Sequence, residues 1–194
     1  KREQAAKAMG AGLIVCQPGG IGKVSRGESG GLAEKALRYV MEAVKAEGMD
    51  YRILCPETMG KGNQFGDLQE VLRFCTLYDN MLPCVDFGHM YARTHGEIDN
   101  YEDFAEIFRR TADKLGEERA KNMHCHFSRI EYSAGGEKKH LTFDDQAFGP
   151  PYEPLIDLLH DQGYTPTIIC ESAGTQAEDA AAMSGYYYNK KNCE

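Results

Sequence analysis

The chain has 194 residues, of which 42% are hydrophobic and 27% are charged, as in a globular protein with one sizeable core. We find no apolar run long enough to span a bilayer and no signal-peptide core after the charged start, so we expect a cytoplasmic protein with no membrane partner. The net charge of −8 disfavours a surface that binds nucleic acid throughout, although metal ions held by carboxylates would offset part of that charge locally.

The seven cysteines stand singly along the chain, and no CxxC pair occurs. Disulfide-stabilised proteins need dense, paired cysteines in an oxidising compartment, so we expect reduced and buried thiols. These residues are Cys16, Cys55, Cys75, Cys84, Cys125, Cys170 and Cys193.

Short apolar runs alternate with longer amphipathic stretches from one end of the chain to the other. After a leading helix over 4–9 that ends at Gly10, the runs predict strands at 13–16, 51–55, 82–85, 123–127 and 167–170. The amphipathic stretches predict helices at about 31–47, 64–78, 101–119, 151–162 and 176–188. Strands that alternate with helices indicate parallel βαβ units.

Polar residues mark the end of every predicted strand: Gln17, Glu57, Asp86, His124 or His126, and Glu171. An open sheet concentrates such residues at one switch point, whereas every strand end of a barrel faces the same mouth. The glycine-rich segment 18–23 matches neither the dinucleotide fingerprint nor the P-loop. We therefore predict a single α/β domain over 1–194 with the (β/α)8 TIM-barrel fold.

A complete barrel has eight strands, and five are predicted here. With roughly 40 residues per βα unit, about 100 residues would precede Lys1 in a barrel of typical size. We expect this chain to supply about five C-terminal βα units of the barrel, with its N-terminal strands missing.

Several of these side chains are of the types that bind divalent metal ions. Asp86 and His89 lie three residues apart where a strand turns into a loop, and His124 and His126 share one strand face. The predicted ligands are Glu57, Asp86, His89, His124 or His126, His140 and Glu171. Imidazole and carboxylate ligands without thiolates favour zinc, manganese or iron, and phosphodiester hydrolysis and sugar isomerisation are the reactions that use such centres.

These residues, taken in order, resemble a known family. The segments 17–19, 57–62, 86–89 and 124–128, followed by His140 and 171–172, look like those of endonuclease IV, a xylose isomerase-like barrel of AP endonuclease family 2. The segment His-Phe-Ser-Arg-Ile-Glu-Tyr at 126–132 is similar to that of shorter endonuclease IV-like proteins.

The resemblance implies a hydrolase that cleaves DNA on the 5′ side of abasic sites in base excision repair, acting as a monomer with two or three zinc ions or with manganese. Glu57 would bridge two metals and, with Glu171, act in catalysis. Asp86, one histidine of the His124 and His126 pair, and Glu171 would complete the second metal site. His89 and His140 would bind the third metal.

Two positions depart from that family. Gln17 stands where the family has a histidine, and Lys138 stands where it has an aspartate. Each change removes a ligand, from the first and the third metal respectively. Two alternatives therefore stay open: a sugar isomerase or epimerase with one divalent ion at Glu57, Asp86, a histidine and Glu171, and a non-catalytic relative that keeps the barrel for binding.

Overall fold

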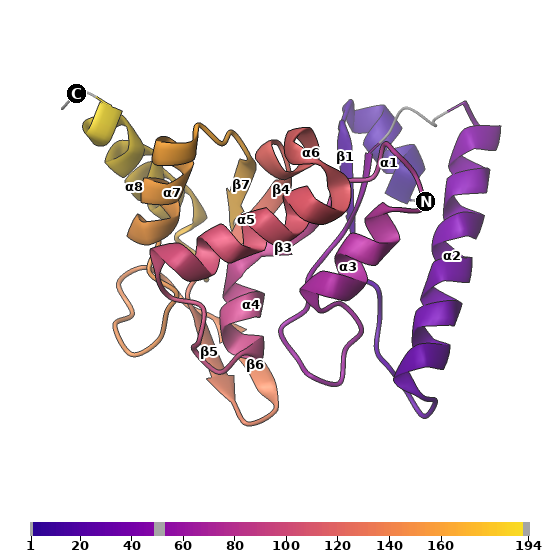
Figure 1. Ribbon diagram of the computed structural model, residues 1–194, viewed down its shortest axis with the longest axis horizontal. Coiled ribbons are helices and arrows are strands. Elements are labelled where there is room, and N and C mark those ends of the chain that lie inside the picture. The colour runs from indigo at the N-terminus through magenta and orange to yellow at the C-terminus, as the bar shows by residue number, and fades with distance from the viewer. Residues whose placement is uncertain (1, 49–52, 192–194) are drawn as a thin grey trace.

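The computed structural model describes residues 2–48 and 53–191 (Figure 1). Its elements follow in the order α1 (Arg2–Met9), β1 (Leu13–Cys16), α2 (Arg26–Ala46), β2 (Ile53–Pro56), α3 (Leu68–Cys75), β3 (Cys84–Asp86), α4 (Phe87–Arg93), α5 (Tyr101–Leu115), α6 (Glu117–Lys121), β4 (His124–Phe127), β5 (Ile130–Ser133), β6 (Gly136–His140), α7 (Glu153–Gln162), β7 (Thr167–Cys170) and α8 (Gln176–Lys191).

The five predicted strands are present and run parallel to one another. β1 pairs with β2, and β3, β4 and β7 form a second parallel sheet in that order. A parallel bridge between Glu57 and Cys84 joins the two sheets, so the strands lie side by side in chain order. This arrangement confirms the predicted α/β fold of a TIM barrel, of which the described strands form one arc. Tyr51 and Arg52, which we predicted to begin the second strand, lie outside the described residues.

Helix capping moves two helix starts away from their predicted positions. α2 begins at Arg26 rather than near 31, because Ser25 and Glu28 form a capping box that satisfies the first free N–H groups. α3 begins at Leu68 rather than near 64, because Asp67 and Glu70 form the same kind of cap. The apolar pattern locates each helix but not its first turn.

The single helix predicted over 101–119 is wrong. Gly116, with a φ of 90°, ends α5 and begins α6, a backbone conformation that residues with a side chain rarely adopt. Helix α4 was not predicted, because it is only seven residues long and follows β3 directly. The antiparallel hairpin β5–β6 was not predicted either, because its charged residues do not show the alternation of a half-buried strand.

Two hydrophobic clusters hold the helices against the sheet. The larger one surrounds β3, β4 and β7 and includes the packed rings of Phe87, Phe104, Phe108 and Phe127. The smaller one lies between α1, α2 and the first two strands. Five cysteines are free and buried, as predicted, whereas Cys16 is partly exposed and Cys193 lies outside the described residues.

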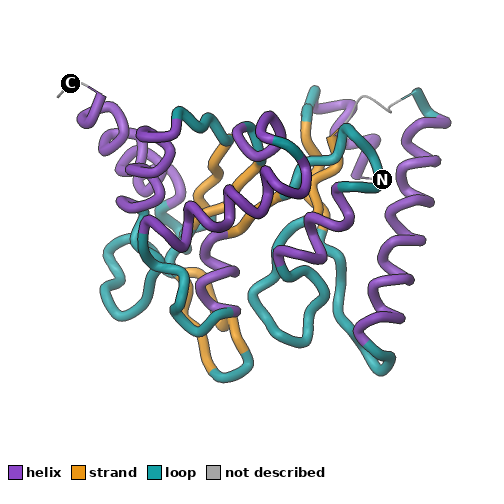
Figure 2. The backbone as a smooth tube through the Cα atoms, viewed as in Figure 1, coloured by secondary structure: helices purple, strands orange, loops and turns teal. Residues whose placement is uncertain are grey.

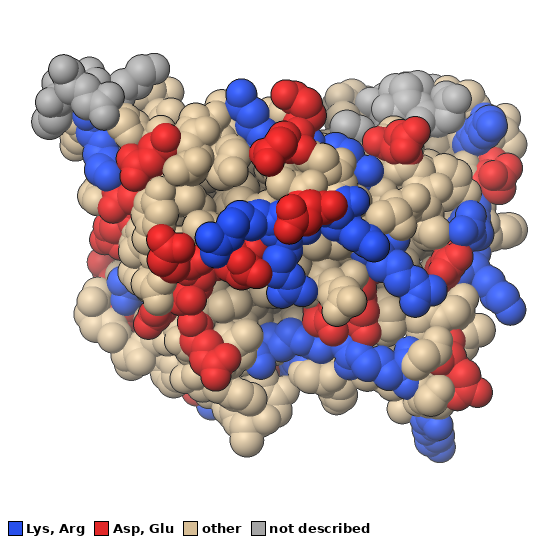
Figure 3. Space-filling view, in the orientation of Figure 1, with Lys and Arg blue, Asp and Glu red and all other residues tan. Residues whose placement is uncertain are grey.

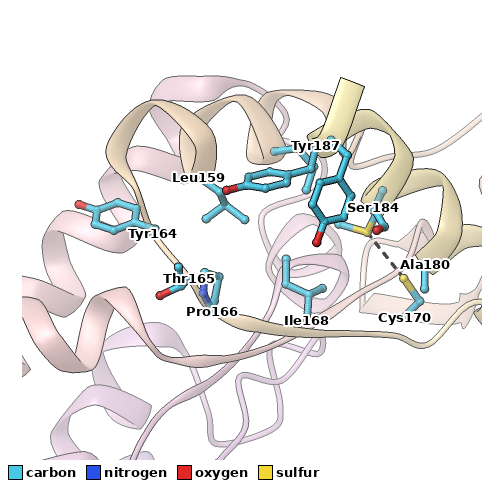
Figure 4. Close-up of a pocket in the computed structure, with 12 residues that line it drawn as sticks. Leu159, Tyr164, Thr165, Pro166, Ile168, Cys170, Ala180, Ser184 and Tyr187 are labelled. Atoms are coloured by element: carbon cyan, nitrogen blue, oxygen red, sulfur yellow. Dashed lines mark hydrogen bonds between the residues drawn. The ribbon is translucent and has the colours of Figure 1, made fainter. Parts of the chain in front are cut away.

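Loops and an apolar cavity lie at different places around the strands. Figure 2 shows loops gathered at the lower edge, where the strands end. Along β7, an apolar cavity of about 360 Å³ lies between this strand, α7 and α8 (Figure 4). Tyr164 and Pro166 line this cavity on the approach to β7, and Tyr187 lines it from α8. None of the helices in the described ranges is long and apolar enough to cross a membrane.

Candidate metal centre

Four predicted ligands meet where the strands end. Glu57 follows β2, Asp86 ends β3, His126 lies in β4 and Glu171 follows β7. One potential ligand atom from each lies within 4.8 Å of the others, and we call these residues the four-ligand group. Glu57, His126 and Glu171 also line a polar cavity of about 480 Å³. The parallel strands therefore bring together side chains that are far apart in sequence.

His126 lies at the centre of this group. Its Nδ1 is 2.8 Å from Oε1 of Glu57, 3.3 Å from Oε1 of Glu171 and 3.9 Å from Oδ2 of Asp86. Burial lowers the pKa of His126, but the hydrogen bond with Glu57 and the charges of Glu171 and Asp86 outweigh it and leave the pKa above its usual value. Three carboxylates thus surround one imidazole.

The two glutamates of the group have opposite pKa shifts. Burial raises the pKa of Glu57, but its hydrogen bond with His126 and the charges of His89 and His126 outweigh this, so the net pKa is lowered. Burial raises the pKa of Glu171. The charge of His126 lowers this pKa, but the charges of Asp86 and Glu57 raise it further, so the net pKa is raised. Glu57 is therefore the more readily ionised of the two.

Asp86 both caps a helix and offers a free carboxylate oxygen. Its Oδ1 accepts a hydrogen bond of 2.7 Å from the backbone N–H of His89 at the start of α4. Its Oδ2 is buried, lies 3.3 Å from Nδ1 of His89 and accepts no hydrogen bond from the described residues. Such an arrangement costs free energy unless a cation or another donor satisfies the oxygen. This atom lies among the other ligand atoms, so the residues present fit a divalent metal ion.

A second group of potential ligands lies beside the first: His89, Glu137 and His140, with ligand atoms within 4.8 Å of one another. Nδ1 of His89 lies 2.9 Å from the carbonyl oxygen of Thr58. A carbonyl can only accept, so Nδ1 carries a hydrogen, and Nε2 is the nitrogen that has a lone pair when the ring is neutral. That Nε2 lies 3.5 Å from Oε2 of Glu137. We call these three residues the hairpin group.

The histidines of the hairpin group have contacts of their own. Nδ1 of His140 is 2.8 Å from the hydroxyl of Ser128, which leaves Nε2 of His140 without this contact. The rings of His89 and His140 pack edge to face at 5.5 Å. Burial lowers the pKa of His89, but the charges of Asp86, Glu137 and Glu57 outweigh it and raise the net pKa.

His124, the other predicted histidine, does not join the carboxylates. It lies one side-chain layer below His126, paired in register with Cys84 rather than with Asp86. It forms a third group of possible ligand atoms with Cys84 and His126. Burial raises the pKa of the Cys84 thiol far above its usual range. Burial and the nearby His126 lower the pKa of His124.

The two substituted positions have other contacts. Gln17 lines the polar cavity, and its side chain hydrogen-bonds to Glu57. Lys138 turns away from the cavity and forms an ion pair with Glu131 on the neighbouring strand. Glu137, which was not among the predicted ligands, lines the cavity instead. Its nearness to His140 in sequence was a signal that could have drawn attention to it.

Parallel strands that end in carboxylates and imidazoles define a barrel with a candidate metal centre, because TIM barrels carry their functional residues at the strand ends. The chain belongs to the xylose isomerase-like TIM barrel family, whose model matches residues 3–186. It is 35% identical over 173 residues to the uncharacterized protein MJ0133 of Methanocaldococcus jannaschii. The match covers 89% of this chain and spans 62% of the length of that relative.

Solved structures with the same fold include enzymes of two kinds. Endonuclease IV of Thermus thermophilus is similar with a TM-score of 0.61 and 17% identity, over 97% of this chain and 65% of its own. A D-tagatose 3-epimerase-like protein gives a TM-score of 0.65 at 17% identity, over 97% of this chain and 67% of its own. The 3-keto-D-glucoside 4-epimerase YcjR of E. coli gives a TM-score of 0.57 at 17% identity, over 98% of this chain and 68% of its own. At this identity the likeness shows the fold.

Proposed function

We propose that the protein is a metal-dependent phosphodiesterase of the endonuclease IV type, which cleaves DNA at abasic sites. The observation that carries this proposal is the presence of two adjacent ligand groups. Nδ1 of His89, in the hairpin group, lies 4.0 Å from Oε1 of Glu57, in the four-ligand group. Centres with two neighbouring ions suit phosphodiester hydrolysis, because they stabilise both the attacking and the leaving oxygen.

The chain's own residues would hold and orient such a centre. Glu57, Asp86, His126 and Glu171 would bind one ion, and His89 and His140 would bind its neighbour. Divalent ions at these positions would supply Lewis-acid stabilisation of the phosphoryl oxygens and lower the pKa of water. Gln17 holds the Glu57 carboxylate in place through a side-chain hydrogen bond, and helix α4 orients Asp86 and His89 together.

The polar cavity offers a cation for the substrate. Lys61 lines it beside Glu57 and His89 and could contact a phosphate group. The face of the molecule in Figure 3 carries Lys and Arg interspersed with Asp and Glu. Such a mixed surface would attract the phosphates of a DNA duplex only weakly. We therefore place DNA at the rim of the cavity, where the loops that follow the strands gather.

An incision assay tests this proposal. Full-chain protein, stripped of metal and reloaded with zinc, manganese or magnesium, is incubated with a duplex that carries one tetrahydrofuran abasic analogue. We expect a cut on the 5′ side of the analogue. Glu57→Gln should lower the incision rate by more than about 100-fold, since even groups that only orient metal ligands are worth about 10–100-fold.

Glu106→Gln is the matched control, because Glu106 is an exposed carboxylate of α5 that lies in neither ligand group. It should cut at the wild-type rate. Absence of incision with all three metals would contradict the proposal.

A sugar isomerase or epimerase is the second candidate. The opposite pKa shifts of Glu57 and Glu171 favour it, because separated pKa values suit an acid and a base acting on one substrate. Gln17 and Gln64 also line the cavity, and Oε1 of Gln64 is buried without a hydrogen-bond partner among the described residues, as would suit recognition of hydroxyl groups.

Exchange of carbon-bound hydrogen in ketohexoses, followed by NMR in D2O with manganese-loaded protein, tests this second function. Exchange that Glu171→Gln abolishes, together with no incision of abasic DNA, would favour the epimerase over the nuclease.

A further inference from the structure

We infer that Glu137, and not Lys138, is the carboxylate that completes a second metal site with His89 and His140, which gives this chain a two-ion centre. The inference deepens the proposed function and rests on it for the use of the second ion. The family resemblance places an aspartate at the position of Lys138, so the sequence suggests a site that has lost its carboxylate. The geometry of the hairpin points to a replacement one residue earlier.

A β-bulge in the hairpin makes this replacement possible. In a regular strand, residues three apart face opposite sides, so Glu137 and His140 would point in opposite directions. The register shifts between Glu131 and Tyr132: Glu131 pairs with Lys139, whereas Tyr132 pairs with Glu137. Lys138 is therefore the extra residue. One inserted residue restores a common side for Glu137 and His140, as bulges next to active sites often do.

The exposure of the side chains agrees with this register. Glu137 and His140 are both partly buried, and both line the polar cavity. Lys138 and Lys139 between them are exposed and both lie near the Glu131 carboxylate. Two successive residues on the solvent side are what a bulge produces. The lysine that replaces the aspartate is thus neutralised outside the site.

Backbone contacts hold Glu137 against the strand ends. Its N–H donates to the carbonyl oxygen of Gly60 at 3.1 Å, and Lys61 forms an antiparallel bridge with Gly136. A Cβ on Gly60 would lie 2.7 Å from Cβ of Glu137 and 3.2 Å from the ring of His89. The glycine therefore leaves the space in which the carboxylate and the imidazole meet.

Ligand atoms of His89, Glu137 and His140 lie within 4.8 Å of one another. Nε2 of His89 lies 3.5 Å from Oε2 of Glu137, and the Nδ1 atoms of His89 and His140 are occupied by Thr58 and Ser128. Second partners of this kind orient a histidine that binds metal through its other nitrogen. Two imidazoles and one carboxylate suit zinc or another first-row divalent ion.

The metal content of the protein tests the inference independently of any enzymatic activity. Full-chain protein is stripped with a chelator, dialysed against zinc, and analysed for ions per chain by mass spectrometry. We expect about two ions in the wild type and about one in Glu137→Gln and in His140→Ala, because the four-ligand group remains. Lys138→Ala is the matched control and should keep both ions. Cobalt(II) reloading gives a second readout, in which Glu137→Gln loses the absorption of one of two sites.

A conservative variant guards against misfolding. Glu137→Asp keeps a carboxylate on the same backbone and should retain both ions with weaker binding of one. Equal zinc content in Glu137→Gln and the wild type would overturn the inference, as would loss of an ion in Lys138→Ala. Ion counts that follow the expected pattern without any DNA incision would leave the inference standing and refute the proposed function. Incision of abasic DNA together with an unchanged zinc content in Glu137→Gln would refute the inference and support the proposed function.

Discussion

Oε1 of Glu57 and Nδ1 of His126 lie 2.8 Å apart, although the two residues are 69 positions apart in sequence. Glu57 follows β2, and His126 lies on β4, with β3 between them. Their contact shows that side chains from non-adjacent strands converge above Asp86, whose Cα is paired in register with that of His126. This convergence, more than any single residue, defines the candidate metal centre.

The first prediction separates the two neighbouring histidines. His126→Ala should weaken zinc binding at the four-ligand group by more than about 100-fold, because it removes a ligand, and even groups that only orient ligands are worth about 10–100-fold. His124→Ala should weaken zinc binding by less than about tenfold, since His124 lies a layer deeper and outside this group. Competition with a chromophoric chelator measures both affinities. A larger loss in His124→Ala would show that the wrong histidine has been placed at the metal.

The second prediction uses the double role of Asp86. Asp86→Asn keeps an oxygen to cap α4 at the N–H of His89, so stability should change little, whereas zinc binding should be lost with the charge. Asp86→Ala should lose zinc binding and also about 1 kcal/mol of stability with the cap.

Urea unfolding of the metal-free proteins and zinc titration provide the two measurements for these variants. An asparagine variant that binds zinc as the wild type does would remove Asp86 from the ligands.

The third prediction concerns pH. The pKa values of His126 and His89 lie above the usual value of 6.5 because nearby carboxylates stabilise their charged forms. A metal ion must displace these protons. As the solution is acidified, zinc affinity should therefore begin to fall while the pH is still above 6.5. The stability of the metal-free protein should change in the opposite direction, because it should fall as the pH rises. The stability contributed by the protonated histidines is fully present below their unfolded pKa and is lost as pH rises through the raised folded pKa.

Calorimetric titration and thermal unfolding across roughly pH 5.5 to 8.5 check both directions. Zinc affinity that stays constant over this range would contradict the assignment of these two histidines.

The fourth prediction concerns the loop that carries Met59, Lys61 and Gln64 into the cavity. Glu70 accepts hydrogen bonds from Nε of Arg26 at 2.6 Å and from the backbone N–H groups of Gly66 and Asp67 at 2.7 and 3.0 Å. Glu70→Gln should destabilise the protein by about 2 kcal/mol at neutral pH, a typical value for hydrogen bonds to a charged group.

The effect of this change should depend on pH. Burial raises the pKa of Glu70, but Arg26 and the backbone donors outweigh it, so the folded pKa lies below 4.5. The stabilisation is present above the unfolded pKa and disappears as pH falls through the folded value. The difference between the variant and the wild type in urea unfolding should therefore shrink in acid. Glu106→Gln, which breaks an exposed pair with Arg109, is the control and should change stability little.

Much of the fold could be predicted because the hydrophobic pattern is local. Apolar runs locate the five strands, and amphipathic stretches locate the long helices. The short α4 and the charged hairpin were not predicted, since neither contains enough turns or alternation to produce a pattern. Helix starts at Arg26 and Leu68 depend on single capping side chains, which a periodicity argument does not detect.

By itself, the sequence determined that parallel strands would end in Glu57, Asp86, a histidine and Glu171, because strand ends in a barrel face one mouth whatever the loops do. Only the tertiary structure decided between His124 and His126, since the choice depends on depth along β4 relative to Asp86 on β3. It also decided that Glu137 lies beside His89 while Lys138 faces Glu131. A bulge shifts the alternation of side chains by one residue, and register with a partner strand is a property of the folded chain.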